Sequence, residues 1–267
     1  MTQNSLIFLK LGGSLITDKT QALTPRLETI RRISVEIAQA RQEDPGCKIL
    51  IGHGSGSFGH AIASRYQTQL GGQGEHFWLG FAHVWQAARK LNQIVIDTLT
   101  SSGLPVIAFP PSASVIANHH TIQKWEMHPI KLALAHDLIP IVQGDVVFDT
   151  EIGGTILSTE QIFQFLADEL QPQKILLAGL DQGVYRNPEH PQEIIPHITP
   201  AILDEVLPVI SGAKTADVTG GMLEKVKLML ALVEQIPTLK IQILSGATPG
   251  NIRKALLGET FGTLITI

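Results

Sequence analysis

The chain has 267 residues, of which 44% are hydrophobic and 16% are charged, and its formal net charge is -4. This composition excludes a disordered chain and argues against a polyanion-binding surface, so we expect no nucleic-acid partner. No uninterrupted apolar run reaches the roughly 18 residues that a membrane-spanning helix needs, so we expect no membrane partner. The single cysteine, Cys47, cannot form an internal disulfide, and no secretory signal precedes the first strand-like segment, which predicts a cytoplasmic protein.

Short apolar runs alternate with longer amphipathic segments along the chain. The runs predicted as buried strands are Leu6–Leu11, Lys48–Gly52, Val106–Phe109, Ile139–Gln143, Lys174–Ala178 and Ile241–Leu244. The segments with helical spacing are Arg26–Arg41, Gly80–Ser102, His128–Asp137, Thr159–Leu170 and Leu223–Ile236. Because strands and helices alternate, we predict a three-layer α/β/α sandwich with a mostly parallel central sheet.

Nothing in the sequence separates the chain into independent domains. It has no internal repeat, no low-complexity linker and no heptad run. We therefore predict a single domain over residues 1–267, with two approximate lobes, residues 1–178 and residues 179–267, that each carry their own glycine-rich loops.

Glycines directly after strands are the most informative feature, because ligands of parallel sheets bind beyond the carboxyl ends of the strands. Gly12 and Gly13 follow the first predicted strand, and Gly54, Gly56 and Gly59 follow the second. Glycine lets backbone N–H groups approach a phosphate closely, and the start of a following helix adds positive potential. A single cluster fits a tight turn equally well, but two clusters together favour anion binding.

Two common nucleotide-binding patterns fit poorly. Neither glycine cluster ends in Gly-Lys-Ser/Thr, so neither is a Walker loop. The segment from Gly54 to Gly59 matches GxGxxG only loosely, and no acidic residue follows at the spacing that grips a ribose hydroxyl. A nicotinamide-dependent dehydrogenase is therefore a weak interpretation.

Charged side chains stand close to these glycines. Lys10, Lys19 and Lys225 each lie in or near a glycine-rich element, where an ammonium group can neutralise phosphate oxygens during transfer. Any one of them alone fits a solvated surface lysine, but Lys10 interrupts an apolar strand, where an unpaired charge is costly. His60 closes the second loop and can donate a hydrogen bond to an anion, although a structural role is the usual one for a lone histidine.

Further glycines and aspartates follow later strands. Gly144 and Asp145 follow the fourth predicted strand, and Asp181, Gly183 and Tyr185 follow the fifth. Strand-end aspartates can orient lysines or hold water around Mg²⁺, and they cap turns about as often. Thr219, Gly220, Gly221 and Met222 precede the helix that carries Lys225, so they form another candidate phosphate-facing helix start. His119, His120 and His128 lack zinc-like spacing, so we assign no protein side chain as a metal ligand.

These motifs, taken together, resemble the amino acid kinase superfamily and most closely the isopentenyl phosphate kinases, whose near cousins include fosfomycin kinases. The resemblance runs nearly end to end. It covers Lys10–Ser14 with Thr17–Lys19, the loop Gly54–His60, Gly144–Val146, Asp181–Tyr185, and Thr219–Met222 with Lys225. The Ser-Phe-Gly-His ending of the loop, at residues 57–60, is the most discriminating part.

The resemblance implies an ATP-dependent kinase of a small phosphate, with Mg²⁺, a homodimeric assembly and a direct in-line transfer to the acceptor. Lys10, Lys19, His60 and Lys225 would be the catalytic residues. The acceptor side would comprise Gly54, Ser55, Gly56, Gly59, His60, Gly144 and Asp145. The nucleotide side would comprise Lys10, Gly12, Gly13, Ser14, Asp181, Gly183, Tyr185, Gly220, Gly221 and Lys225.

Some positions depart from the family pattern. Ser55 stands where a third glycine is common, Leu157–Glu160 stands where Ser-Gly-Asp-Asp is usual, and Ala178–Gln182 also differs. Three alternatives therefore remain open: isopentenyl phosphate as acceptor, a phosphonate such as fosfomycin or another phosphomonoester, and a catalytically silent nucleotide-binding protein. Helices around Gly80–Ala88 and Ser112–Ile116 are expected to set the depth of the acceptor pocket.

Overall fold

A computed structural model describes residues 5–187, 193–211 and 221–267 of the chain. Its main feature is an eight-stranded sheet with the order β12-β14-β13-β9-β1-β2-β6-β3. The strands are β1 (Leu6–Leu11), β2 (Lys48–His53), β3 (Val106–Ala108), β6 (Ile139–Gln143), β9 (Lys174–Gly179), β12 (His197–Ile198), β13 (Lys240–Ser245) and β14 (Thr263–Ile265). All neighbouring pairs are parallel except β13 with β14.

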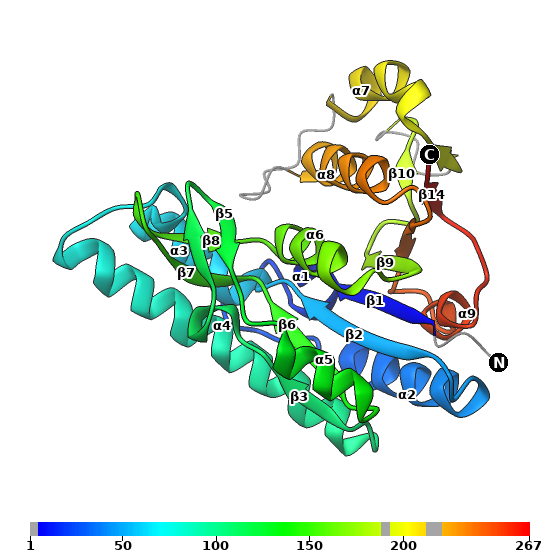
Figure 1. Cartoon of the computed structure of the whole chain (residues 1–267), viewed down its shortest axis with the longest axis horizontal. Coiled ribbons are helices and arrows are strands. Elements are labelled where there is room, and N and C mark those ends of the chain that lie inside the picture. The colour runs from blue at the N-terminus through cyan, green and yellow to red at the C-terminus, as the bar shows by residue number, and fades with distance from the viewer. Residues whose placement is uncertain (1–4, 188–192, 212–220) are drawn as a thin grey trace.

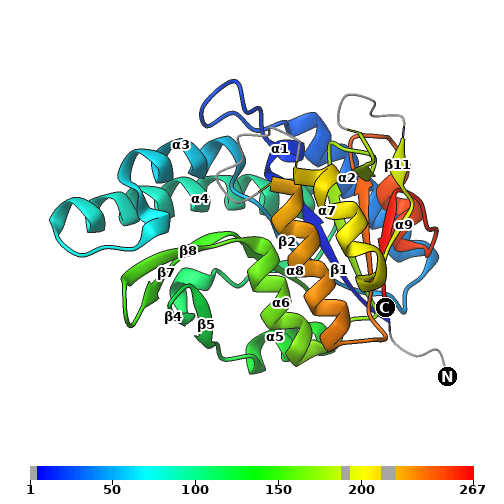
Figure 2. The same ribbon diagram turned by 90° about the horizontal axis from the view of Figure 1, so that it is seen from above.

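Helices cover both faces of this sheet, as Figures 1 and 2 show. One face packs against α5 (His128–Ala135), α6 (Thr159–Leu170), α7 (Leu203–Ser211) and α8 (Gly221–Gln235). The other face packs against α1 (Gly13–Ile16), α2 (Leu27–Glu43), α4 (Glu75–Ser101) and α9 (Asn251–Leu256). The predicted α/β/α sandwich with a mostly parallel sheet is therefore confirmed.

The two hydrophobic cores follow from the alternation of side chains along each strand. In β1, Phe8 points into the core beneath α6 and α8, whereas Leu9 points into the core above α2 and α4. Phe8 and Phe163 of α6 are both fully buried, and their ring centroids lie 5.1 Å apart. Strands covered on both faces must be apolar on both faces, which explains why they form unbroken hydrophobic runs in the sequence.

Two smaller sheets lie outside the main one. A four-stranded sheet has the order β5-β4-β7-β8 and consists of β4 (Ile116–Asn118), β5 (Thr121–Lys124), β7 (Asp145–Asp149) and β8 (Gly153–Leu157). Its strand β7 contacts α4 beside α3 (Gly56–Tyr66), and Ala63, Phe77, Phe81, Val84 and Val146 form a third hydrophobic cluster there. Figure 2 shows this sheet facing α3 and α4. The strands β10 (Val184–Tyr185) and β11 (Ile194–Ile195) form the third sheet.

Most predicted elements end within one or two residues of the observed bounds, and three larger differences bear on the site. Helix α4 begins at Glu75, five residues before the predicted start, and α3 begins inside the second glycine loop, where no helix was predicted. Glycine and serine lower helix propensity, so α3 depends on packing of Phe58 and Ala63 rather than on local preference. The expected helix around Ser112–Ile116 was wrong, because Pro110 and Pro111 lead into a 3₁₀ turn at Pro111–Ala113, followed by β4.

Among the described residues, no helix has both the length and the apolar character required to cross a bilayer. The long helix α4 has 27 residues, but it is amphipathic and buries only one side against the protein.

Candidate active site

A cavity of about 990 Å³ lies beyond the carboxyl ends of β1, β2, β6 and β9. Most of the residues singled out from the sequence line it: Lys10, Gly12, Gly13, Ser14, Lys19, Gly54, Ser55, Gly56, Gly59, His60, Gly144, Asp145, Asp181, Tyr185, Gly221 and Lys225. Gly183 does not, since it packs against Thr263 of β14, and Gly220 lies outside the described residues. Lys10 and His60, which are 50 positions apart, therefore face one space.

The two glycine loops touch each other through their backbones. A Cβ atom on Gly13 would lie 2.5 Å from the Gly56 nitrogen, and one on Gly56 would lie 2.6 Å from the Gly13 carbonyl oxygen. Gly56 also has a φ of +48°, a conformation that favours glycine. No side chain fits at this contact, so glycine is required at both positions.

Thr17 joins the two loops through its fully buried side chain. Its hydroxyl donates to the Gly13 carbonyl at 2.7 Å and accepts from the Ser57 N–H at 2.9 Å. The second of these bonds uses a backbone N–H at the start of α3 that the helix itself leaves unpaired. His60 follows in the next turn of α3 and lines the same cavity.

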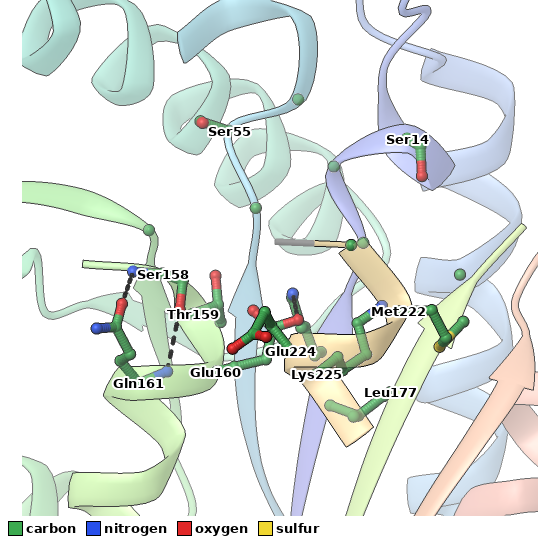
Figure 3. A pocket seen from close by; sticks show the side chains of 18 of the residues that line it. Ser14, Ser55, Ser158, Thr159, Glu160, Gln161, Leu177, Met222, Glu224 and Lys225 are labelled. Carbon is green, nitrogen blue, oxygen red and sulfur yellow. Dashed lines mark hydrogen bonds and ion pairs between the residues drawn. The ribbon is translucent and has the colours of Figure 1, made fainter. Parts of the chain in front are cut away.

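A buried acidic group pairs with one of the candidate lysines and interacts electrostatically with a second. Glu160 of α6 forms an ion pair with Lys10 of β1, and both side chains are almost 90% buried. Burial raises the pKa of Glu160, but the charges of Lys10 and Lys225 outweigh this effect and hold its pKa below the usual range. Figure 3 shows Glu160 from α6 and Lys225 from α8 in the cavity.

Sequence reasoning did not select Glu160, because it treated Leu157–Glu160 only as a departure from a family pattern. Ser158 and Gln161 form a capping box at the start of α6: the Gln161 N–H donates to Ser158 Oγ at 3.2 Å, and the Ser158 N–H donates to Gln161 Oε1 at 2.8 Å. This cap fixes the first turn and places Glu160 near the positive end of the helix. The sequence signal that could have identified Glu160 is an acidic residue in the first helical turn after the capping residue Ser158.

Asp145 is a second buried acid at the cavity wall, with 1% of its surface exposed. Its carboxylate accepts the Ser112 N–H at 3.2 Å and the Val146 N–H at 3.0 Å. Burial raises the pKa of Asp145 to about 6, and these hydrogen bonds only partly oppose that shift. The group therefore ties the 3₁₀ turn at Pro111–Ala113 to the start of β7.

One wall of the cavity is apolar. Ala63 of α3, Val84 and Ala88 of α4 and Ile156 of β8 line it, and Gln69 is the polar residue beside them. The expected contribution of α4 residues 80–88 therefore holds for Val84 and Ala88. None of residues 112–116 lines the cavity. Thr159, Leu180, Glu224 and Lys227 also line it and were not selected from the sequence as site residues, whereas Met222, named as part of a candidate helix start, does line it.

Comparison with known proteins places this site in a family. The model of the amino acid kinase family matches residues 5–245. The chain belongs to the amino acid kinase family. Within this family it is 34% identical over 272 residues to the isopentenyl phosphate kinase of Methanothermobacter thermautotrophicus, covering 98% of this chain and 99% of the relative. The enzyme of the same name from Methanocaldococcus jannaschii is 33% identical, with 97% and 98% covered.

Solved structures agree with this assignment to the amino acid kinase family. A structure titled as isopentenyl phosphate kinase matches with a TM-score of 0.83 at 32% identity, covering 98% of this chain and all of the other. An N-acetylglutamate synthase from Neisseria gonorrhoeae matches with a TM-score of 0.70 at 15% identity, which shows a shared fold alone.

The Lys10–Glu160 pair leads to a prediction for Glu160→Gln. Removing the carboxylate takes away the charge that orients the Lys10 ammonium group and balances that of Lys225, so kcat for acceptor-dependent ADP release should fall by roughly 10²-fold. Steady-state kinetics of the purified variant measure this change. Glu224→Gln, also at the cavity wall, is the control and should lose far less activity. Equal losses in the two variants would show that Glu160 has no special role.

Asp145 predicts a pH-dependent stability difference. The folded protein keeps the Asp145 proton up to about pH 6, whereas the unfolded chain releases it near pH 4. The folded state thus binds more protons than the unfolded state between these pH values. Asp145 therefore lowers the free energy of unfolding as the pH rises from about 4 to about 6, and its unfavourable contribution stays constant above about pH 6. Because Asp145→Asn cannot titrate, its free energy of unfolding should rise relative to wild type across that range.

Urea denaturation at several pH values measures the free energies. The exposed Asp168→Asn is the control for adding one amide. If the difference in the free energy of unfolding between Asp145→Asn and the wild type did not change from pH 4 to pH 7, the raised pKa of Asp145 would be contradicted.

Proposed function

We propose that this chain transfers the γ-phosphate of ATP to isopentenyl phosphate, giving isopentenyl diphosphate. The observation that carries the proposal is the single cavity in which two touching glycine loops, the Lys10–Glu160 pair, Lys225 and His60 meet beside an apolar wall. Anions fit the glycine and lysine side, and a short hydrocarbon tail fits the wall formed by Ala63, Val84 and Ala88. The relatives named isopentenyl phosphate kinase at about one third identity support the same substrate.

The two ligands are assigned to different parts of the cavity. The acceptor lies over residues 1–178, where His60 and the backbone N–H groups of the Gly54–Gly59 loop hold its phosphate. The nucleotide lies over residues 179–267, beside Asp181, Tyr185 and Gly221. The sites for the two phosphates meet near Lys10, which belongs to the central strand β1 and is shared by both ligands.

The chemistry follows from these positions. An oxygen of the acceptor phosphate attacks the γ-phosphorus directly, and the bond from that phosphorus to the β–γ bridging oxygen breaks as ADP leaves. The protein contributes alignment and positive charge rather than a covalent intermediate. Lys10, Lys19 and Lys225 stabilise the charge on the moving phosphoryl group, and Glu160 orients Lys10 through their ion pair while its charge partly offsets those of Lys10 and Lys225.

The proposed cofactor Mg²⁺ would be held mainly by the phosphates of the nucleotide. Within the described residues, no three His, Cys, Asp or Glu side chains gather into a metal-ligand cluster. Mg²⁺ commonly binds through substrate phosphates and water with one or two carboxylates, so this donor set is compatible with it. Asp181 is the exposed carboxylate at the nucleotide side of the cavity, and we assign it the water-mediated contact.

We also propose a cytoplasmic homodimer. The family resemblance suggested the homodimer, and the single cysteine and the lack of a secretory signal suggested the cytoplasm. Leu79 and Trp85 of α4 are exposed apolar side chains that a second copy of the chain can cover. Multi-angle light scattering of the purified chain should give twice the chain mass, and Trp85→Glu should shift it to a single-chain mass. A single-chain mass for the wild type would contradict the dimer.

A panel of acceptors with labelled ATP tests the function. Isopentenyl phosphate should give a higher kcat/KM than fosfomycin and than small phosphates without a hydrocarbon tail, because its tail contacts the apolar wall. Dimethylallyl phosphate, an isomer with a tail of the same size, belongs in the panel as a comparison. If fosfomycin gave the highest value, the acceptor would be a phosphonate. ATP binding without acceptor-dependent ADP release would show a silent nucleotide-binding protein.

The His60→Ala variant in the same panel tests the acceptor side. Its KM for isopentenyl phosphate should rise and its kcat should fall, because the bond from His60 persists into the transition state. The KM for ATP should stay close to that of the wild type. Wild-type kinetics in this variant would remove His60 from the site.

A further inference from the structure

His53 is a fully buried histidine that none of the steps above uses. It is the last residue of β2 and directly precedes the Gly54–Gly59 loop. Its ring nitrogens face two oxygen atoms: Nε2 lies 2.9 Å from Asn92 Oδ1 of α4, and Nδ1 lies 3.1 Å from the Gly54 carbonyl oxygen. Asn92 is itself 94% buried and does not line the cavity.

The surroundings of His53 decide which nitrogen carries the proton. Burial lowers its pKa, and the hydrogen bonds to Asn92 and Gly54 only partly oppose that shift, so the ring is neutral at pH 7. A neutral imidazole has one N–H group and can donate to only one of the two oxygens. The Gly54 carbonyl can only accept, whereas the Asn92 amide can turn over and present its NH₂ group. Nδ1 therefore carries the hydrogen and donates to Gly54, and Nε2 accepts from Asn92.

The hydrogen bond from His53 to the Gly54 carbonyl also determines where the N–H group of the Gly54–Ser55 peptide points. A trans peptide is planar, so the Ser55 N–H points away from the Gly54 carbonyl to which it is bonded. Because the carbonyl points to the buried His53 ring, the Ser55 N–H points to the opposite side, and Ser55 lines the cavity. No hydrogen bond within the described part of the chain uses that N–H.

The backbone of His53 is anchored as firmly as its side chain. Its carbonyl oxygen accepts from the Gly144 N–H at 3.0 Å and from the Thr159 hydroxyl at 2.8 Å. Thr159 is the neighbour of Glu160, which pairs with Lys10. His53 thus joins the Gly54–Gly59 loop to the helix start that orients the lysines.

We propose that His53 is a positioning residue, held by Asn92, that turns the Ser55 N–H toward the phosphate of the acceptor. It acts through the peptide between Gly54 and Ser55 and does not touch the substrate. The proposal rests on the proposed function in assigning the acceptor to this loop. The direction of the peptide and the proton position on the ring are independent of which substrate binds.

The test uses Asn92→Leu, which keeps the size of the side chain and removes its amide. The KM for isopentenyl phosphate should rise roughly tenfold, as expected for one lost buried hydrogen bond, while the KM for ATP changes less than about twofold. The exposed neighbour Gln93→Leu is the matched control and should behave as wild type. An unchanged acceptor KM, or equal increases in both KM values, would overturn the proposal.

His53→Asn and His53→Leu give a second comparison. An asparagine amide nitrogen can take the place of Nδ1 and donate to the Gly54 carbonyl, so His53→Asn should keep more acceptor affinity than His53→Leu. If the two variants have the same acceptor KM and the same kcat, His53 is merely a packing residue.

Nitrogen NMR of the full chain labelled with ¹⁵N-histidine tests the proton position without any substrate. The His53 signals, identified by their absence in His53→Asn, should show a neutral ring protonated at Nδ1 at pH 7. A ring protonated at Nε2, or one that is charged at pH 7, would overturn the proposal. Failure of the wild type to phosphorylate isopentenyl phosphate would instead refute the proposed function and leave this result intact.

Discussion

The site depends on a contact between two stretches of backbone that no side chain separates. Gly13 and Gly56 approach so closely that an added Cβ at either would overlap the other loop. This contact brings the end of β1 and the start of α3 together and gives the two phosphate-binding loops a common edge. The hydroxyl of Thr17 then fixes their relative orientation through one bond to each loop.

Charge inside the cavity is balanced rather than simply positive. Lys10 stands in the middle of the main sheet, where an unpaired ammonium would carry a large desolvation cost. Glu160 offsets that cost and sits at the capped start of α6, where the helix also favours a negative group. The Lys10 ammonium group is thus held in place by a protein carboxylate at the point where the proposed phosphates meet. The segment that departs from the family pattern thus still provides a carboxylate.

The sequence predicted the central strands well, because strands buried on both faces must be apolar throughout, and Leu6–Leu11 shows this directly. Gly13 and Gly56 were also identified, because each lies in a glycine cluster directly after a predicted strand. The sequence did not predict α3, because Gly56 and Gly59 have low helix propensity and the helix depends on the packing of Phe58. It missed the pairing of Glu160 with Lys10, because partners 150 positions apart leave no local pattern. The hydrogen bond between His53 and Asn92 was missed for the same reason.

The order of strands also bears on how the protein is made. β1 is translated first, yet it pairs with β9, more than 160 positions later, as well as with β2. Lys10 must wait for α6 before it gains its acidic partner, and for α8 before Lys225 joins the pair. During synthesis the first strand therefore has one open edge until most of the chain has left the ribosome. Until β9 pairs with β1, that apolar edge can aggregate with other chains. The nascent chain therefore needs protection during synthesis that the folded protein no longer needs.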